Sequence, residues 1–451
     1  MAQTKHSSVI TLTLDPPALR WLLLVPVLLA LIGVWFAVRW YVGNTIAEYT
    51  STPDADGIAM AQMAVRWAPD NAFGYWRLGS LEEKNFSADN LAAAVREFKL
   101  AVEVEPFDFR YWMELGRALE AAGDTPHAER ALRRAVELAP AYSHPLWQYG
   151  NLLLREGRTD EAFAELARAA EADWQMEAPV FGLARQVFGD DLAAITRAFP
   201  SSSLRLHFAL NLIRSSENAD DALRVVETVN AADRKKESEA LTDLLKACIS
   251  ARRYRAALAL VRDLQTDGEQ VPTAENFWNA GFELPLVIAD DKPFHWLINS
   301  RSDAQVTTDN ARPHSGRSSL RIIFKAPNKL DSIPISQTVV VEPDTQYKLQ
   351  FYARTENLLS ARLPVVSISD PAGVPLQSSP PLPSGTNDWQ PVTISFRTKP
   401  KQEGIVITFY RDPCADKEPI CPIFGTAWYD DFSLQRISGG AAGPKPGSAD
   451  R

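Results

Sequence analysis

The 451-residue sequence is poor in metal-binding residues and has no excess of positive charge. It contains three cysteines and six histidines, too few for a zinc-ribbon or multi-metal framework. Its 47 Lys and Arg residues face 56 Asp and Glu residues, which gives a formal net charge of −9. This balance disfavours a protein that binds nucleic acid through a basic surface. The apolar fraction of 46% and the charged fraction of 23% are typical of a folded globular chain.

Known catalytic motifs are also missing from the sequence. The histidines are scattered without an H-E-x-x-H spacing, and no G-x-S-x-G elbow, P-loop or dinucleotide fingerprint occurs. Asp430 and Asp431 are adjacent, so on a strand they would point to opposite faces and could not form a facing pair of carboxylates. We therefore expect a non-catalytic protein. An enzyme whose catalytic residues match none of these motifs is the third hypothesis, after the two scaffold functions given below.

One long run without charge lies near the N-terminus. Residues 21–38 (WLLLVPVLLALIGVWFAV) would span about 27 Å as a helix, enough for a thin hydrocarbon core. Arg20 and Arg39 flank the run, and Trp21, Trp35 and Trp40 lie near its ends, as in an aromatic belt. We predict a transmembrane anchor over residues 21–42. A cleaved signal peptide is the alternative, which the length of the run and the lack of a nearby A-x-A pattern disfavour.

The charges around this run predict the orientation of the chain. Lys5 and Arg20 precede it, whereas mainly acidic residues follow Arg39. The positive-inside rule then favours a cytoplasmic tail over residues 1–20 and a periplasmic body, as in a single-pass protein of a bacterial inner membrane. Cys414 and Cys421 flank a short loop and can close a disulfide, which would persist in an oxidising compartment. Two unrelated free thiols are the alternative.

A helical repeat is predicted over residues 55–267. Gly79, Gly116 and Gly150 are 37 and 34 residues apart, and Pro106 and Pro140 are again 34 apart. Small residues let two helices approach closely, and proline ends the second helix of a pair. Over residues 57–174 this pattern resembles the tetratricopeptide repeat. Beyond it, less regular helical pairs are expected to continue the solenoid.

The tetratricopeptide resemblance implies a concave face that holds a peptide or protein partner. The groove positions of the family fall on the first helix of each repeat. Trp, Met and Arg are frequent in protein interfaces. Packing of these side chains on a neighbouring helix or on the terminal domain is the alternative. The groove candidates are Trp76, Arg110, Met113, Arg117, Trp147 and Asn151.

From about residue 276 to residue 437 the apolar pattern changes from period 3.6 to period 2. Six or more alternating runs separated by turns predict a β-sandwich. Four segments resemble, in the right order, CenC-like carbohydrate-binding modules, which implies a jelly-roll fold. Residues 438–451 are predicted to be a flexible tail. The four segments are 277–283 (FWNAGFE), 314–321 (HSGRSSLR), 347–354 (YKLQFYAR) and 428–434 (WYDDFSL).

The second resemblance implies a carbohydrate site, although such a fold does not establish sugar binding. Strand parity separates an apolar core set from a polar set with tyrosines, which could hold a glycan, particularly an acidic one. A solvated sheet face and a docking face for the solenoid are the alternatives. The glycan-binding candidates are Arg321, Gln350, Tyr352, Arg354, Arg397 and Tyr410.

The same resemblance implies a structural calcium ion near the first and last strands. Glu283 and either Asp430 or Asp431 would supply the oxygen ligands that this hard cation prefers. The alternative is that these acids make hydrogen bonds at the strand ends. No other cofactor is expected.

The sequence as a whole predicts a multidomain chain with a transmembrane helix, a TPR-like α-solenoid and a β-sandwich. We expect a membrane-anchored scaffold in envelope or exopolysaccharide assembly, with a protein partner in the groove and a glycan on the sandwich. The alternative is a protein-only adaptor whose β-sandwich caps the solenoid and buries its last apolar edge.

Overall fold

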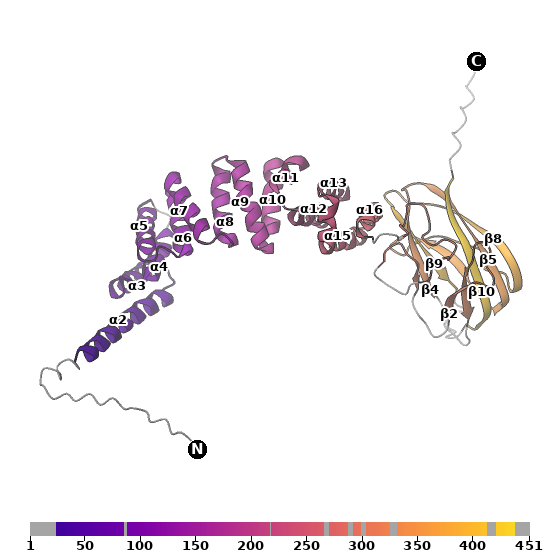
Figure 1. The fold of residues 1–451 in the computed structure, drawn as a ribbon, viewed down its shortest axis with the longest axis horizontal. Helices are drawn as coiled ribbons and strands as arrows, with labels where there is room; N and C mark the ends of the chain where they lie inside the picture. The colour runs from indigo at the N-terminus through magenta and orange to yellow at the C-terminus, as the bar shows by residue number, and fades with distance from the viewer. Residues whose placement is uncertain are drawn as a thin grey trace, which may run out of the picture. The chain divides into compact units, whose positions relative to one another are not determined.

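The computed structural model describes residues 24–84, 88–216, 218–265, 270–286, 292–298, 304–324, 332–412 and 421–437. The chain divides into two compact units, with the boundary between Phe199 and Pro200. Helices make up the described part of the first unit (Figure 1). The second unit contains further helices and two antiparallel sheets. The predicted order of an apolar helix, a helical repeat solenoid and a β-sandwich is confirmed.

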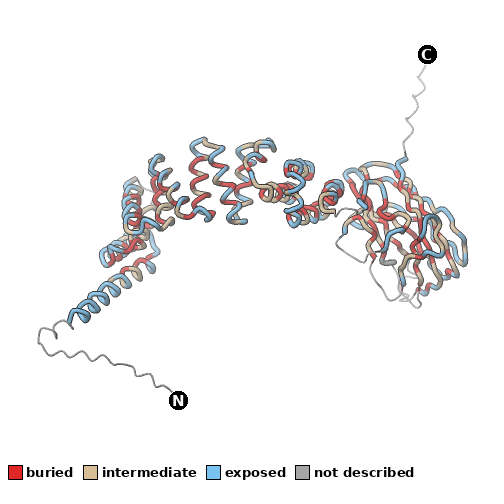
Figure 2. Tube along the Cα trace, viewed as in Figure 1, coloured by how far each residue is buried: buried red, intermediate tan, exposed pale blue. Residues whose placement is uncertain are grey.

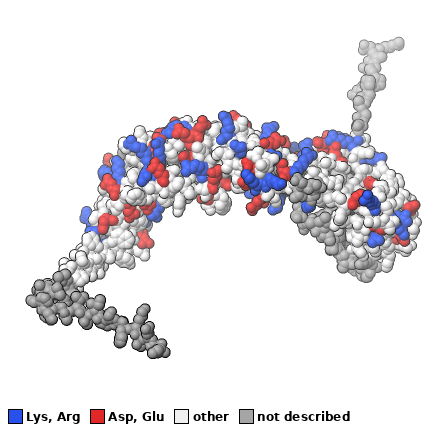
Figure 3. Space-filling view, in the orientation of Figure 1, with Lys and Arg blue, Asp and Glu red and all other residues white. Residues whose placement is uncertain are grey.

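The first described helix, α2 (Leu24–Tyr49), is long and apolar enough to cross a membrane. Its first part is exposed along its length (Figure 2) and is almost free of charge (Figure 3). The helix continues well beyond the apolar run, and its last turns are covered by other helices. Gly43 and Ala47 are buried there. A Cβ atom at Gly43 would lie 2.6 Å from the Cβ of Ala68, so glycine is what allows this close approach.

Antiparallel helix pairs follow α2 in the first unit. In the paired helices α4–α5, α6–α7 and α8–α9, the glycine predicted to allow close packing faces a large side chain. A Cβ atom at Gly116 would lie 2.5 Å from Cγ of Leu132, and one at Gly150 would lie 2.7 Å from Cγ of Leu166. The helices are α3 (Ala55–Trp67), α4 (Ala72–Glu83), α5 (Ala88–Val104), α6 (Phe109–Ala121), α7 (Thr125–Leu138), α8 (Ser143–Arg155), α9 (Thr159–Ala172), the 3-10 turn η1 (Trp174–Met176), α10 (Glu177–Phe188) and α11 (Leu192–Ala198).

The second unit begins with helices that continue the pairing. Helix α12 packs on α13 and α15, and α15 packs on α16. The short α14 lies in a charged stretch without an apolar face. The helices are α12 (Ser202–Ser216), α13 (Ala219–Glu227), α14 (Ala231–Lys236), α15 (Ser238–Ser250) and α16 (Tyr254–Leu264).

Two five-stranded antiparallel sheets form the β-sandwich. The first has the order β1-β4-β9-β6-β7 and the second the order β2-β3-β10-β5-β8. The strands are β1 (Leu297–Ile298), β2 (Ala304–Asp309), β3 (Ser319–Phe324), β4 (Ser332–Val340), β5 (Gln346–Ser360), β6 (Val365–Ser369), β7 (Pro375–Ser378), β8 (Gly385–Arg397), β9 (Gly404–Tyr410) and β10 (Ile423–Arg436).

Aromatic side chains dominate the core between the two sheets. Trp296 contacts Phe409 and Phe432 edge to face, and Phe351 stacks on Phe432 at 4.9 Å between ring centroids. These rings are buried, and large apolar areas of this kind supply most of the stabilisation of a small sandwich. The inward side chains alternate with outward ones along β5, as period 2 requires.

Within the second unit, the sandwich supplies a cap for the last helix. Helix α16 has no side-chain cap of its own at Arg253. The buried carboxylate of Glu403, which precedes β9, accepts a hydrogen bond of 3.0 Å from the backbone N–H of Arg255. A Cβ atom at Gly404 would lie 2.8 Å from the ring of Tyr254, so the two surfaces are in close contact. A carboxylate at this position accepts a hydrogen bond from an N–H group that has no partner within the helix. Its negative charge is also attracted by the positive end of the helix dipole.

Candidate functional site

The large groove candidates of the solenoid are half-buried. Trp76 on α4, Met113 on α6 and Trp147 on α8 pack against the core of the first repeats while keeping part of their surface exposed. Each comes from the first helix of its pair, as the repeat pattern predicts. The structure therefore places these three side chains at equivalent positions but also gives each of them a packing role.

The polar groove candidates have partners within the solenoid. Arg117 donates two hydrogen bonds, of 2.9 and 3.0 Å, to the Glu83 carboxylate of the preceding repeat. One repeat later, Arg155 pairs with Glu120 at 2.5 Å. These pairs form a ladder that joins successive first helices. In addition, Asn151 donates to the backbone oxygen of Trp147, and Arg110 pairs with Asp108.

The first groove candidate is linked to the end of α2. Trp76 stacks on Phe73 at 5.3 Å between centroids, and the Arg77 guanidinium lies over both rings. Arg77 also donates a 2.9 Å hydrogen bond from Nε to the backbone oxygen of Ala47. A cation near the last carbonyls of a helix is favourable. The aromatic pair is therefore held against the last turns of α2.

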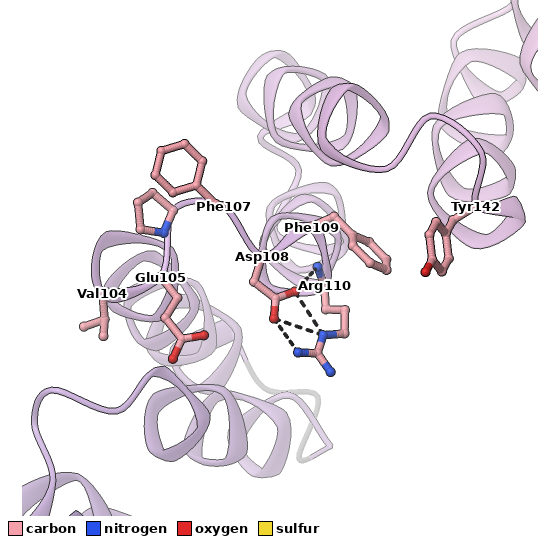
Figure 4. A pocket seen from close by; sticks show the side chains of 8 residues that line it. Val104, Glu105, Phe107, Asp108, Phe109, Arg110 and Tyr142 are labelled. Carbon is pink, nitrogen blue, oxygen red and sulfur yellow. Dashed lines mark hydrogen bonds and ion pairs between the residues drawn. The ribbon is translucent and has the colours of Figure 1, made fainter. Parts of the chain in front are cut away.

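An open hollow of about 750 Å³ lies at the turn between α5 and α6 (Figure 4). Phe107 is 79% exposed at its edge, and Tyr142 is 61% exposed. Phe109 contacts the Tyr142 ring at 5.2 Å between centroids. The sequence signal for this site was weak: Phe107 follows Pro106 directly, and Tyr142 comes two residues after Pro140.

One carboxyl group of the solenoid is held in an unfavourable environment. Burial and the nearby Glu97 carboxylate raise the pKa of Glu82 to about 7, and the positive charge of Arg96 opposes this shift. Its Oε2 atom is buried and has no hydrogen-bond partner among the described residues. Desolvation disfavours the charged form of a carboxyl group, which is the main cause of this shift.

The structure brings five of the six glycan candidates to the outer face of the second sheet. Arg321 lies on β3, and Gln350, Tyr352 and Arg354 are outward residues of β5. Arg397 belongs to the same sheet but sits at the far end of β8, opposite Gln346, and pairs with Asp344.

Tyr410 is not brought to this face. It lies on β9, in the first sheet, where it is opposite Val365. Its neighbour Phe409 faces the core, so Tyr410 points away from it on the other side of the sandwich. The expected common surface of Tyr352, Arg354 and Tyr410 is therefore absent from the described sandwich.

An aromatic cluster lies on the outer face of the second sheet. His314 stacks on Tyr352 at 3.7 Å between ring centroids and meets Trp389 edge to face at 5.5 Å. The His314 Nδ1 atom lies 2.6 Å from Oδ2 of Asp431, and Tyr352 accepts a long hydrogen bond from Gln350. All three rings are partly exposed. Aromatic rings beside planar polar groups are the elements that hold sugar rings.

Trp428, beside this cluster, has a different environment. Only 4% of its surface is exposed, because Arg312 and Arg354 lie over its ring. Its indole N–H donates to Asp309 at 2.8 Å. Trp428 therefore serves as a support for the arginines rather than as an open platform.

The calcium candidates lie close together but are used in hydrogen bonds. Glu283 accepts from the backbone N–H groups of Arg317 and Ser318, and Asp430 accepts from the N–H of His314 at 2.9 Å. Burial raises the pKa of Asp430 to about 6, and the hydrogen bond from His314 opposes this shift. Asp431 binds His314 and Ser315. No group of three or more metal-ligating side chains is arranged for a metal within the described ranges.

The cysteines have two different environments. Cys248 on α15 is free and buried. Cys421 is buried at the start of the segment before β10 and takes part in a disulfide. Its predicted partner, Cys414, lies outside the described residues, so the pairing of Cys414 with Cys421 stays a prediction.

Comparison with protein families identifies one repeat. The tetratricopeptide repeat model matches residues 109–142, which cover α6, α7 and the turn to α8. The matched model describes a repeat that serves in protein interaction and not a catalytic domain. No curated protein matches the chain.

Solved structures are similar to separate parts of the chain. YrrB, described as a TPR protein with an unusual peptide-binding site, is 19% identical over 38% of this chain and 82% of its own, with a TM-score of 0.27. A structure named "CBM4 structure and function" is 16% identical over 36% of this chain and 100% of its own, with a TM-score of 0.27.

A MamA double mutant is 18% identical over 26% of this chain, with a TM-score of 0.24, and the chain spans 64% of its length. Similarities this low carry no argument about function. The fold assignment rests on the helices and strands of this chain. Together with the repeat match, these elements define a solenoid followed by a β-sandwich.

Proposed function

We propose that this protein is a membrane-anchored, non-catalytic scaffold in envelope or exopolysaccharide assembly. In this proposal α2 spans a bacterial inner membrane, the N-terminus is cytoplasmic and the folded body is periplasmic. The solenoid recruits a protein partner, and the β-sandwich binds a glycan. The observation that carries the glycan part is the partly exposed cluster of His314, Tyr352 and Trp389.

The chemistry of the second sheet supports a glycan ligand. Aromatic rings pack on the apolar faces of sugars, while amide and guanidinium groups hydrogen-bond to hydroxyl or carboxylate groups. Gln350 and Arg354 flank Tyr352 on the outer side of β5. Arg354 pairs with Asp388 and Arg321 pairs with Asp309, so neighbouring carboxylates hold both guanidinium groups on this face. Guanidinium groups would favour an acidic glycan over a neutral one.

Recruitment of a protein partner is supported by the groove candidates. Trp76, Met113 and Trp147 each keep part of their surface exposed on first helices of the solenoid. A partner segment can contact these apolar surfaces without unpacking them. The ion-pair ladder beside them offers charged groups to the same segment.

A protein-only adaptor is the second candidate function. The observation that favours it is the cap that Glu403 supplies to α16, because this contact gives the sandwich a structural role that needs no ligand. The cap involves an end of the sandwich and not the face that carries Tyr352. The structural role and a glycan site are therefore compatible.

A glycan array distinguishes these two functions. The full chain in detergent is screened against acidic and neutral bacterial polysaccharides, together with Tyr352→Ala and Tyr410→Ala. Since Tyr410 lies on the other sheet, it is the matched control. We expect Tyr352→Ala to weaken binding at least about tenfold and Tyr410→Ala to leave it unchanged. A folded chain that binds no glycan would favour the protein-only adaptor.

A further inference from the structure

The α2–α3 hairpin has two ends of different character. One end is near the apolar run of α2 and carries Arg39, Trp40, Tyr41, Arg66 and Trp67. The opposite end, where α2 ends and α3 begins, carries the exposed acidic residues Glu48, Asp54 and Asp56. Aromatic and basic residues are typical of the membrane interface, whereas acidic residues are not attracted to an anionic membrane surface.

Specific contacts hold the turn between α3 and α4 at the level where the apolar run ends. Arg39 pairs with Asp70 at 2.5 Å, and Asn71 donates a 3.4 Å hydrogen bond to Asn44. The close approach of Gly43 to Ala68 lies between these two contacts. If α2 spans the bilayer, this turn lies at the membrane surface. The last residue of α3, Trp67, is then close to the membrane, and its first residue, Ala55, is farther from it.

The membrane-proximal end of α3 presents an apolar stripe to the outside. Trp67 is 40% exposed at the last position of α3, and Met63 and Met60 are 45% and 43% exposed on the preceding turns. On α2, Trp40 and Tyr41 are exposed near the level of Trp67. Arg66 is exposed beside Trp67. The one acid in this turn, Asp70, is already paired with Arg39.

We propose that the turn between α3 and α4 is a second membrane contact. Trp67 lies in the headgroup region, where its ring and N–H group suit the boundary between apolar and wet layers, and Arg66 binds a lipid phosphate group. The first helical pair of the solenoid is thereby held in one orientation to the bilayer. This inference rests on the proposed membrane span of α2.

Depth-dependent fluorescence quenching tests this contact. The full chain carries Cys248→Ala, keeps the disulfide of Cys421, and receives one labelled cysteine at Trp67, Arg66, Ala55 or Leu29. Ala55 is the matched control, because it begins α3 and lies about 18 Å along the helix from Trp67. Each labelled chain is placed in phosphatidylcholine vesicles with or without a nitroxide-labelled lipid.

We expect the label at Leu29 to be quenched most and the labels at Trp67 and Arg66 to be quenched at least about twofold more than the label at Ala55. Quenching at Leu29 with equal, low quenching at the other three positions would overturn the second contact and leave the membrane span intact. Low quenching at Leu29 as well would overturn the span itself. Shielding of the label at position 67 from aqueous iodide, without quenching by the labelled lipid, would mean a protein contact and would also overturn the proposal.

Discussion

The helical repeats and the β-sandwich use their outward side chains differently. On the solenoid, the groove candidates Arg117 and Asn151 are engaged in contacts within and between repeats. On the second sheet of the sandwich, Tyr352 and Trp389 lie outside the core and pack mainly with His314. The difference suggests that changes in the groove affect stability and binding together, whereas changes on the sheet face affect binding alone.

The largest loss of stability is expected from closing the space between paired helices. Gly116→Ala places a Cβ atom 2.5 Å from Leu132, so we expect a loss of about 1–3 kcal/mol in the free energy of unfolding. Gly79→Ala meets Phe98 at 3.1 Å and should cost less. Thermal and urea unfolding measure both.

Gly182→Ala is the control for this prediction. Gly182 is exposed on α10, and a Cβ atom there would meet no atom within 4 Å. We expect it to stabilise the chain by about 0.5–1 kcal/mol, because alanine is the better helix former. Equal effects at Gly116 and Gly182 would refute the account of helix packing.

The next effect concerns the cap that the sandwich gives to α16. Glu403→Ala leaves the N–H of Arg255 without its acceptor and should cost about 1 kcal/mol. Differential scanning calorimetry would show α12–α16 and the sandwich melting with reduced cooperativity. Glu342→Ala is the control, since Glu342 is more exposed and contacts Arg255 through the guanidinium alone. Equal losses from both variants would argue against a capping role.

The stability of the solenoid should depend on pH through Glu82. Because its folded pKa is raised to about 7, the folded state binds this proton more tightly than the unfolded chain. This stabilising contribution is complete below the unfolded pKa and is lost as the pH rises through about 7. Urea titrations at pH 5 and pH 8 measure the loss.

Glu82→Gln should remove this pH dependence and stabilise the chain at pH 8 by about 1 kcal/mol, after allowance for solvent screening of a half-exposed group. Glu97→Gln is the comparison variant: it removes a carboxylate that helps to raise the pKa of Glu82 but leaves Glu82 itself in place, so it should reduce this pH dependence only in part. A wild-type chain that is no less stable at pH 8 than at pH 5 would contradict the assignment.

The smallest effects on stability are expected at the ion-pair ladder and at Tyr352. Arg117→Ala removes a partly buried pair with Glu83 and should cost about 0.5–1 kcal/mol. Tyr352→Ala should cost less, within about 0.5 kcal/mol, because its ring lies outside the core. A loss of several kcal/mol at Tyr352 would show that the sheet face is structural and would remove the contrast between the two regions.

The sequence predicted the elements well where one physical rule dominates. Recurring Gly79, Gly116 and Gly150 indicated paired helices, and period 2 indicated the strands. Parity places Tyr352 and Tyr410 outside the core, but it does not say which strands pair. The pairing of β9 with β4 and β6, and of β5 with β10 and β8, separates the two tyrosines. Contacts between strands far apart in the sequence therefore determine which sheet each tyrosine belongs to.

The junction residues were also outside the reach of sequence patterns. The apolar run ends near Val38, yet α2 continues to Tyr49 because Gly43 and Ala47 pack on other helices of the solenoid. Glu403 is an isolated acid in the sequence, and its role depends on the distant N-terminus of α16. Neither contact leaves a periodic signal.

Flotation of vesicles tests the central claim most directly. Vesicles carrying the full chain are mixed with a labelled acidic polysaccharide selected by the array and separated on a density gradient. The account predicts that the polysaccharide floats with vesicles that carry the wild-type chain or Tyr410→Ala, and stays behind with Tyr352→Ala. If the folded chain floats and the polysaccharide never does, the claim of a membrane-anchored glycan-binding scaffold is wrong.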